Sequence, residues 1–277
     1  SQFELKKLSI RYFPDQTFKI DADAIIHLAG IAHDLKKVSS SEEYYEANFE
    51  LTKQLFNSFL LSSSKVFIYI SSVKASTDSI NGILTEKDNP DPQTHYGKSK
   101  LMAEKYIQSH TLPYGKSYYI LRPCMIHGPG NKGNLNLLYK FVQKGIPYPL
   151  ASFENKRSFL SIENLCFVIK ELLLQQGVPS GIYQVSDDEA LSSNEVVSIL
   201  AKSLNRSPRL WHLPKSLIYI LAKIGDKFSL PLTTERLNKL TENFVVSNEK
   251  IKSVLKIKLP IQSREGLKIT SYSFRRK

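Results

Sequence analysis

The first half of the chain alternates short apolar runs with longer amphipathic segments. Residues 23–30, 65–70 and 117–126 are short and rich in β-branched and aromatic residues, which is typical of buried strands. Residues 42–58 carry an apolar stripe at helical spacing, and residues 99–109 also have a helical pattern. Strands that alternate with helices usually pair in parallel. The pattern therefore predicts an α/β fold built on a parallel sheet.

The composition limits the class of protein. The chain has 277 residues and a formal charge of +12. No apolar run approaches the eighteen or so residues of a membrane-spanning helix, so no span is predicted. Cys124 and Cys166 lie among apolar residues, which predicts buried, reduced thiols and a cytoplasmic location. The positive charge fits a solvated basic surface, an anionic substrate, or peripheral contact with nucleic acid or acidic lipid.

A tyrosine and a lysine in the segment His95-Tyr96-Gly97-Lys98-Ser99-Lys100 point to proton-transfer chemistry. Tyr96 and Lys100 are four residues apart at the head of a predicted helix, so their side chains leave the same face. An ammonium group nearby favours the phenolate and lowers the pKa of a tyrosine. We therefore predict that Tyr96 exchanges a proton with a hydroxyl or carbonyl group near neutral pH.

The region before Tyr96 supplies a family resemblance. The strand over residues 65–70 ends in Ser71-Ser72, and Ser72 precedes Tyr96 by 24 residues (96 − 72). A serine at a strand end, a long loop and YxxxK resemble the extended short-chain dehydrogenase/reductase family, the NAD-dependent nucleotide-sugar epimerases and dehydratases. The resemblance implies catalysis by Ser72, Tyr96 and Lys100. Tyr96 would be the general base, Lys100 would hold the nicotinamide ribose, and Ser72 would hydrogen-bond the reacting oxygen.

The resemblance also implies a cofactor site for NAD or NADP, and no metal. The segment Asp23 to Ala29 resembles the family's D-x-x-x-H-L-A motif, with His27 itself expected to be structural. Asn48 and Thr52 resemble N-x-x-G-T, in which the asparagine braces the active-site strand and supports the catalytic residues, although Leu51 replaces the family's glycine. The residues expected at the cofactor are Leu28, Ala29, Gly30, Asn48, Ser71, Tyr96, Lys100 and Pro123.

A second group of motifs resembles the family's substrate site. Residues 128–133 spell G-x-G-x-x-G, but Pro129 removes a backbone donor and the segment follows YxxxK, so we reject a pyrophosphate loop there. The longer run that begins at Leu121-Arg122-Pro123 and reaches Gly128-Pro129 instead resembles the family's L-R-P-x-x-x-x-G-P loop. Asn134 would contact the sugar nucleotide, and Arg157 would reach its diphosphate. Ser72 and Lys74 complete the expected substrate contacts.

The resemblance implies a Rossmann-type, doubly wound parallel sheet with a smaller mixed α/β substrate lobe. We expect residues 1–126 to form the NAD(P)-binding domain. Residues 127–277 would form mainly the substrate lobe, with the chain returning to the first domain around 158–186. The first glycine is Gly30 and the first methionine is Met102, so we expect the family's first strand, glycine-rich loop and first helix to precede Ser1 in the natural protein. We predict that residues 209–228, which are largely apolar, form a helix that packs within the substrate lobe and not a membrane anchor.

Two activities and one binding role are compatible with these motifs. The first is epimerisation at C4 of a UDP-hexose or UDP-N-acetylhexosamine. The second is NAD(P)H-dependent reduction of a UDP-4-keto-deoxysugar for surface polysaccharide synthesis. A dehydratase is disfavoured, because Val73-Lys74 stand where that family places an acidic pair. The third is a non-catalytic nucleotide- or RNA-binding member, which would not need Ser72, Tyr96 and Lys100 together. The family resemblance also predicts a homodimer and makes a nucleic-acid partner unlikely.

Overall fold

The computed structural model describes residues 3–31, 40–131, 133–228 and 232–276, and they form two compact units. Unit 1 contains the chain up to Asp78, together with Glu86–Pro123 and Glu171–Gln184. Unit 2 contains Ser79–Thr85, Cys124–Lys170 and the chain from Val185 onward. The chain therefore passes between the units several times, and each unit is described by itself.

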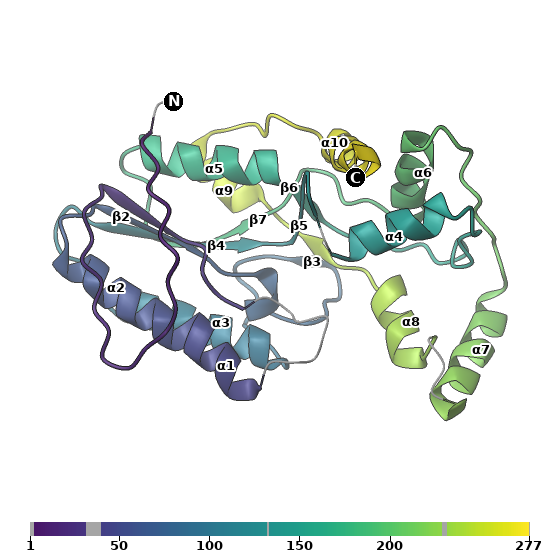
Figure 1. The fold of residues 1–277 in the computed structure, drawn as a ribbon, viewed down its shortest axis with the longest axis horizontal. Coiled ribbons are helices and arrows are strands. Elements are labelled where there is room, and N and C mark those ends of the chain that lie inside the picture. The colour runs from purple at the N-terminus through teal and green to yellow at the C-terminus, as the bar shows by residue number, and fades with distance from the viewer. Residues whose placement is uncertain (1–2, 32–39, 132, 229–231, 277) are drawn as a thin grey trace. The chain divides into compact units, whose positions relative to one another are not determined.

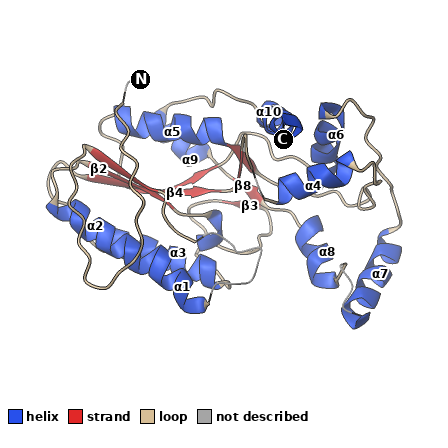
Figure 2. Cartoon of the chain, in the orientation of Figure 1, coloured by secondary structure: helices blue, strands red, loops and turns tan. Residues whose placement is uncertain are grey.

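Unit 1 is organised by a sheet with the strand order β1-β2-β4-β7 (Figures 1 and 2). Its strands are β1 (Ala24–His27), β2 (Val66–Ile70), β4 (Ser117–Pro123) and β7 (Gly181–Val185). The pairs β1–β2 and β2–β4 are parallel. Parallel neighbours bring the carboxyl ends of β1, β2 and β4 to one edge, where open α/β sheets bind ligands. The predicted parallel α/β class is confirmed.

One face of this sheet is covered by a helical segment and a second helix. The segment comprises α1 (Ser41–Tyr45), a turn of π-helix (Glu46–Glu50) and α2 (Leu51–Leu61), and it packs against α3 (His95–Gln108). The core between them and the sheet consists of Leu55, Phe56, Phe59, Phe67, Tyr69, Ala103, Ile107 and Ile120. The prediction of an uninterrupted helix over 42–58 misses the π-helical turn, which contains Asn48.

Unit 2 contains short strands and most of the remaining helices. Its elements are β3 (Ile83–Leu84), β5 (Met125–His127), α4 (Asn134–Gln143), β6 (Phe159–Ser161), α6 (Ser193–Ser203), α7 (Lys215–Phe228), α8 (Thr234–Thr241), β8 (Val245–Val246), α9 (Glu249–Leu255), α10 (Ser263–Ser273) and a final 3₁₀ turn, Phe274–Arg276. Helix α5 (Ile162–Leu174) contributes to both units. The strand pairs β5–β6 and β3–β8 are parallel. Helices α4, α6 and α10 meet over a shared apolar core.

Three further details concern single segments of the fold. Residues 3–12 and 16–20 form no strand. The prediction that both thiols are buried is wrong for Cys166, which is exposed because its neighbours Leu165 and Val168 occupy the inward positions of α5; Cys124 is buried, and both thiols are free. Ser192 caps α6 in a capping box with Glu195. None of the helices in the described part of the chain is long and apolar enough to cross a bilayer.

Candidate active site

The end of β2 delivers two serines with different surroundings. Ser71 is buried, and its amide donates to the carbonyl of Leu121 on β4 over 2.8 Å, continuing the sheet hydrogen bonding. Ser72 is half-buried and caps the 3₁₀ turn Val73–Ala75, since its hydroxyl accepts from the Lys74 amide at 3.2 Å. The strand therefore ends with Ser72 at the carboxyl edge of the sheet and its hydroxyl held by a local turn.

Helix α3 begins earlier than predicted, and this places Tyr96 in its first turn. Thr94 is the N-cap, and its hydroxyl accepts from the Gly97 amide at 3.2 Å. A β-carbon at Gly97 would lie 2.4 Å from the Lys74 carbonyl and 2.8 Å from Pro92 Cβ. Only glycine allows this close approach, which fixes the helix start against the loop after β2 and brings Tyr96 to Ser72.

The Tyr96 side chain is close enough to Ser72 for that hydroxyl to affect its titration. Burial raises the pKa of Tyr96 above its ordinary value of 10.0, the Ser72 hydroxyl lowers it, and the nearby Tyr44 raises it. The predicted lowering of the Tyr96 pKa is therefore wrong for this structure, because loss of solvent outweighs the favourable contact. The Tyr44 and Tyr96 rings lie 6.3 Å apart between centroids.

Lys100 lies one helical turn after Tyr96 and is buried. Its ammonium group donates to the Ile70 carbonyl at 3.0 Å and lies 4.8 Å from the centre of the Tyr69 ring. Burial lowers the pKa of Lys100 from 10.5 to about 8, and Glu104 raises it. Lys100 is thus anchored on the last residue of β2, immediately before the two serines.

One turn further along α3, Glu104 is the centre of a buried polar cluster. Its carboxylate pairs with Arg122 on β4 at 2.6 Å, and both side chains are almost completely buried. Ser71 donates a hydrogen bond to the same carboxylate. Tyr96, Lys100 and Glu104 share one helix face at successive turns, so the cluster links this face to the ends of β2 and β4.

Asn48 connects the end of β1 to α3. Its side-chain amide donates to the Ile31 carbonyl and the Ser99 hydroxyl, each at 3.0 Å, and its oxygen accepts from the Ile31 amide at 2.9 Å. Ser99 in turn donates to the Tyr96 carbonyl at 2.9 Å. The side chain therefore ties the loop after β1 to the backbone that carries Tyr96.

His27 is a hydrogen-bonded core histidine. The Thr52 hydroxyl donates its proton to the Asn48 carbonyl at 2.7 Å. In the contact of 2.9 Å between Thr52 and Nε2 of His27, the hydroxyl must therefore be the acceptor. His27 is thus the neutral tautomer that carries its proton on Nε2. Burial and the charge of Lys100 lower the pKa of His27 to about 3. This histidine stays neutral throughout the physiological range and supports the Asn48 turn.

The residues expected around a dinucleotide gather at the same sheet edge. Gly30 follows β1 with a positive φ of 156°, and a β-carbon there would lie 2.5 Å from Asn48 Oδ1 and 3.3 Å from the Lys100 ammonium. Leu28 is exposed and Ala29 half-buried just before it, while Pro123 ends β4. Glycine at this point lets the chain pack directly against Asn48 and Lys100 at the carboxyl end of β1, which is the edge where open α/β sheets bind a dinucleotide.

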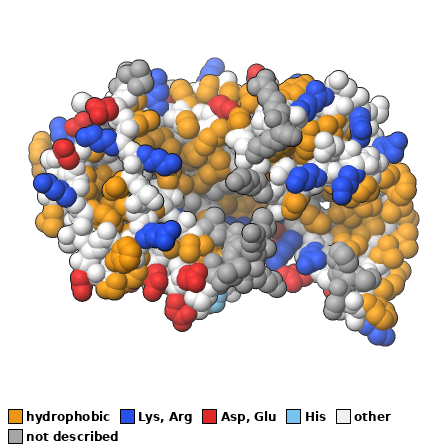
Figure 3. Space-filling view, in the orientation of Figure 1, with side chains coloured by type: hydrophobic (Ala, Val, Ile, Leu, Met, Phe, Trp, Pro, Cys, Tyr) orange, Lys and Arg blue, Asp and Glu red, His pale blue; other side chains and the backbone are white. Residues whose placement is uncertain are grey.

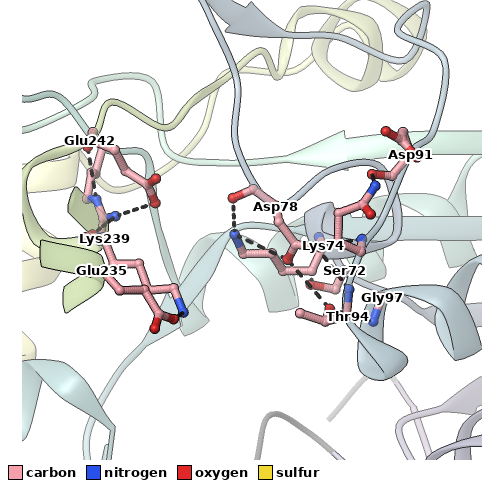
Figure 4. Close-up of polar contacts among 11 residues, drawn as sticks. Ser72, Lys74, Asp78, Asp91, Thr94, Gly97, Glu235, Lys239 and Glu242 are labelled. Atoms are coloured by element: carbon pink, nitrogen blue, oxygen red, sulfur yellow. Dashed lines mark hydrogen bonds and ion pairs between the residues drawn. The ribbon is translucent and has the colours of Figure 1, made fainter. Parts of the chain in front are cut away.

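Lys74 lies in a loop organised by Asp78 (Figure 4). The Lys74 ammonium donates to the Asp78 carbonyl at 2.8 Å, and the Asp78 carboxylate accepts from the amides of Gln93 and Thr94 at 2.8 and 3.2 Å. Asp78 thereby joins the loop after Ser72 to the cap of α3. The sequence did not single out Asp78, since an isolated aspartate in a polar loop gives no distinctive signal.

The two substrate residues predicted in unit 2 occupy separate elements. Asn134 is exposed at the first position of α4. Arg157 is half-buried, and its guanidinium donates to the Lys239 carbonyl at the end of α8 and pairs with Glu242 at 3.1 Å. A cleft of about 440 Å³ lies beside Glu242, lined by residues 79–82 and 241–243. Lys132, in the predicted substrate loop, lies outside the described residues.

Comparisons with known proteins agree with the fold and site. Residues 13–186 match the model of the NAD dependent epimerase/dehydratase family. The chain is 32% identical over 255 residues to a UDP-glucose 4-epimerase of Vibrio cholerae, covering 90% of this chain and 76% of that protein. It is 28% identical to an N-acetyl-α-D-glucosaminyl-diphospho-ditrans,octacis-undecaprenol 4-epimerase of Escherichia coli O157:H7, covering 83% of this chain and 67% of that protein. The chain therefore belongs to the NAD-dependent epimerase/dehydratase family, as its motifs predict.

Solved structures share the fold at lower sequence identity. The UDP-N-acetylglucosamine 4-epimerase of Bacillus cereus has a TM-score of 0.72 at 20% identity, covering 92% of this chain and 80% of that one. The UDP-glucuronic acid 4-epimerase of Bacillus cereus, solved with NAD, has a TM-score of 0.71 at 19% identity, covering 92% and 75%. These similarities confirm the predicted Rossmann-type class.

Proposed function

We propose that this chain is an NAD(P)-dependent epimerase that inverts C4 of a UDP-hexose or UDP-N-acetylhexosamine. The observation that carries the proposal is the position of Lys100, which lies one turn after Tyr96 on α3 and donates to the Ile70 carbonyl, two residues before Ser72. A hydroxyl pair next to a buried ammonium, at the ligand-binding edge of a parallel sheet, suits proton exchange with a sugar hydroxyl. The activity of the Vibrio cholerae relative supports C4 as the reacting carbon.

A nicotinamide cofactor would supply the acceptor and donor of the C4 hydride. The residues that would hold it are Leu28, Ala29 and Gly30 after β1, with Asn48, Ser71, Lys100 and Pro123 around them. Gly30 favours this assignment, because its missing side chain lets the turn after β1 pack directly against Asn48 and Lys100. The presence of NAD in the Bacillus cereus UDP-glucuronic acid 4-epimerase structure supports the same class of cofactor.

Tyr96 and Ser72 would divide the proton chemistry between them. Tyr96 would take the proton of the C4 hydroxyl as the carbonyl forms, and return it when the carbonyl is reduced on the other face. Ser72 would donate to the same oxygen and stabilise its developing charge. The raised pKa of Tyr96 favours the protonated phenol, so the charged Lys100 would be needed to make the phenolate accessible.

Three further residues are proposed to contact the sugar nucleotide. Lys74 follows the catalytic serine directly, and its ammonium lies in the loop that Asp78 organises. Asn134 stands at the exposed start of α4. Arg157 presents a guanidinium that already pairs with a carboxylate, Glu242, and a diphosphate would offer the same fork of acceptors.

One relative suggests a second substrate of the same chemistry. The Escherichia coli O157:H7 relative, by its name, inverts C4 of an N-acetylhexosamine joined to undecaprenol through a diphosphate. A polyprenyl diphosphate sugar presents the same hexose and diphosphate as a UDP-sugar, so Tyr96 and Arg157 would have the same roles. We treat this lipid-linked sugar as the alternative substrate of the proposed epimerase.

The test follows C4 by NMR in the complete natural gene product. UDP-glucose, UDP-N-acetylglucosamine and their 4-keto derivatives are incubated with it, while absorbance reports the nicotinamide. Inversion at C4 with no net change in cofactor supports the epimerase. Consumption of reduced cofactor with a keto sugar alone would make the protein a ketoreductase instead. Bound cofactor without turnover of any sugar would favour the non-catalytic binding role.

Two further expectations stay predictions. The homodimer rests on the family resemblance and is checked by light scattering. The cytoplasmic location rests on two cysteines, which are both free. Fractionation of the cells that express the gene checks that location.

A further inference from the structure

Helix α7 has an apolar surface that its own unit does not cover. Its inward row is Ile218, Ala222 and Gly225, all buried. Next to that row runs a second one with the helical spacing i, i+3, i+4, i+7, i+11, and each of its members is between 42% and 64% exposed. We define this exposed row as the α7 stripe: Leu217, Ile220, Leu221, Ile224 and Phe228. The helix was expected only to pack within the lobe, and this second apolar face is unexplained by that role.

The charges around the α7 stripe are positive. Lys223 and Lys227 are four residues apart, so they form the row that borders the stripe on its side away from the core. The carboxylate in this helix, Asp226, lies beyond the buried row, where it accepts from the Thr234 amide at 3.0 Å. Residues 202–241 contain eight lysines and arginines against two carboxylates. The partner of this surface must therefore be both apolar and anionic.

The surface is also convex, because it is the outer side of a helix. Figure 3 shows hydrophobic side chains gathered along the edge of the molecule where α7 and the segment before it lie. Trp211, in that segment, is 54% exposed. An aromatic residue near an amphipathic helix with lysines at its border is the pattern of a helix that lies in the interface of a bilayer.

A second copy of this chain is a poorer partner for the same surface. In a twofold dimer the same patch meets itself, so the lysine rows of two copies would border one shared apolar contact. Like charges held that close are unfavourable, and nothing in the α7 stripe offers a compensating carboxylate. An acidic lipid surface instead provides apolar chains for the stripe and negative headgroups for the lysines.

We propose that the α7 stripe binds the surface of an anionic membrane, with Lys223 and Lys227 on the phosphate groups. The helix would lie in the plane of the bilayer and would not span it. This inference goes beyond the proposed epimerase and does not depend on it. It would bring the protein to a surface on which sugars carried by polyprenyl diphosphates are found.

The test measures binding of the purified full-length protein to vesicles by sedimentation. One set of vesicles is pure phosphatidylcholine, and the other also contains phosphatidylglycerol. We expect binding to the anionic vesicles that weakens as salt is added. Ile220→Glu and Phe228→Glu should each weaken it about tenfold or more, since each places a carboxylate against lipid. Lys223→Glu/Lys227→Glu should weaken binding only to the anionic vesicles.

Leu61→Glu is the matched control, because Leu61 is an apolar residue at the end of α2 in unit 1 and is 91% exposed. It should bind vesicles as the unchanged protein does. All variants alter exposed side chains, and thermal unfolding checks that each is folded. Turnover of a UDP-sugar without vesicles should be the same in all of them, which separates this proposal from the catalytic one.

Three results would overturn the proposal. The first is an absence of binding to the anionic vesicles. The second is an equal loss of binding in Leu61→Glu and Ile220→Glu. The third is a dimer, seen by analytical ultracentrifugation, that Ile220→Glu separates while vesicle binding is unchanged, because the stripe would then be an interface between copies.

Discussion

Helices α3 and α7 have the same length but opposite relations between residue type and exposure. Each spans 14 residues. In α3 the buried positions include Ser99, Lys100 and Glu104, while α7 leaves a row of apolar side chains in contact with solvent. Ordinary amphipathic helices bury their apolar face and expose their charges. Each departure costs stability in the isolated chain, so each indicates a ligand or partner that the helix serves.

The two departures are arranged differently. In α3 every buried polar group has a bonding partner: Lys100 on the Ile70 carbonyl, Glu104 on Arg122, and Ser99 on Asn48. That arrangement holds side chains in fixed positions, as proton transfer requires. In α7 the exposed side chains form a continuous surface without internal bonds, which suits a broad and fluid partner. The following predictions test that contrast.

The largest effect is expected from Tyr96→Phe. Removing the hydroxyl beside Ser72 removes the proposed acid and base together, so kcat should fall by about 10²–10⁴-fold. Turnover is measured by NMR at C4, with thermal unfolding as the check on folding. Tyr106→Phe is the control, because this tyrosine is on the same helix but its hydroxyl bonds Asn57. An equal loss in both variants would mean that the helix, and not the hydroxyl of Tyr96, is needed.

Glu104→Gln should destabilise the fold strongly. The change leaves the Arg122 guanidinium buried without its counter-charge, and the free energy of unfolding should fall by about 3–5 kcal/mol. Urea titration measures it. Glu235→Gln, which alters an exposed ion pair with Lys239 on α8, should cost no more than about 0.5 kcal/mol. The double change Glu104→Met/Arg122→Met should recover much of the loss, and a double variant as unstable as Glu104→Gln would contradict this account of the pair.

Lys100 should make stability depend on alkaline pH. Its pKa is about 8 in the folded protein against an ordinary 10.5, so between these values the unfolded chain holds a proton that the folded chain lacks. The free energy of unfolding therefore rises as the pH increases from 8 to 10.5, by about 3 kcal/mol in total. Below pH 8 Lys100 is charged in both states, and the folded protein bears the full cost of burying that charge.

The comparison is with Lys100→Met, which cannot titrate. Subtracting its free energy of unfolding at each pH cancels the titration of the tyrosines common to both proteins. As the pH rises from 8 to 10.5, the free energy of unfolding of the unchanged protein should increase relative to that of the variant. A constant difference would show that Lys100 is not desolvated as the structure indicates.

The smallest effect is expected on the outer side of α7. Ile220→Ala, at an exposed position, should change the free energy of unfolding by no more than about 0.5 kcal/mol. Ile218→Ala, two residues earlier and buried, should cost about 2–5 kcal/mol. Urea titration of both variants makes the comparison. A large loss at Ile220 would mean that the unit itself covers the stripe, which would remove the reason to look for a partner.

The regular part of the fold could be predicted from the sequence because much of β2 and β4 is buried, so that their sequences are mostly apolar. Continuous apolar runs identified β1, β2 and β4, and YxxxK with its upstream serine identified the family. The boundaries of the helices were harder to predict from the sequence. Thr94 as the cap of α3, and the π-helical turn around Asn48, depend on contacts with residues far away in the sequence.

The proposed catalytic residues could be placed on one helix face from the sequence, but their electrostatics could not be predicted. Spacing placed Tyr96 and Lys100 on one face, yet the pKa of Tyr96 follows mainly from burial, which a sequence does not display. Glu104 continues the same spacing by one more turn and could have been noticed. Its partner Arg122 was visible as part of a motif, but pairing across the sheet edge is a tertiary contact.

The most direct test of the epimerase follows the hydrogen at C4. A UDP-sugar carrying deuterium at C4 is converted by the complete gene product, and the product is analysed by NMR and mass spectrometry. The account predicts an inverted product that keeps its deuterium, with no net change in cofactor and with conversion by Tyr96→Phe slowed about 10²–10⁴-fold. Exchange of the deuterium for solvent hydrogen, or full activity in Tyr96→Phe, would contradict transient oxidation at C4 by this site.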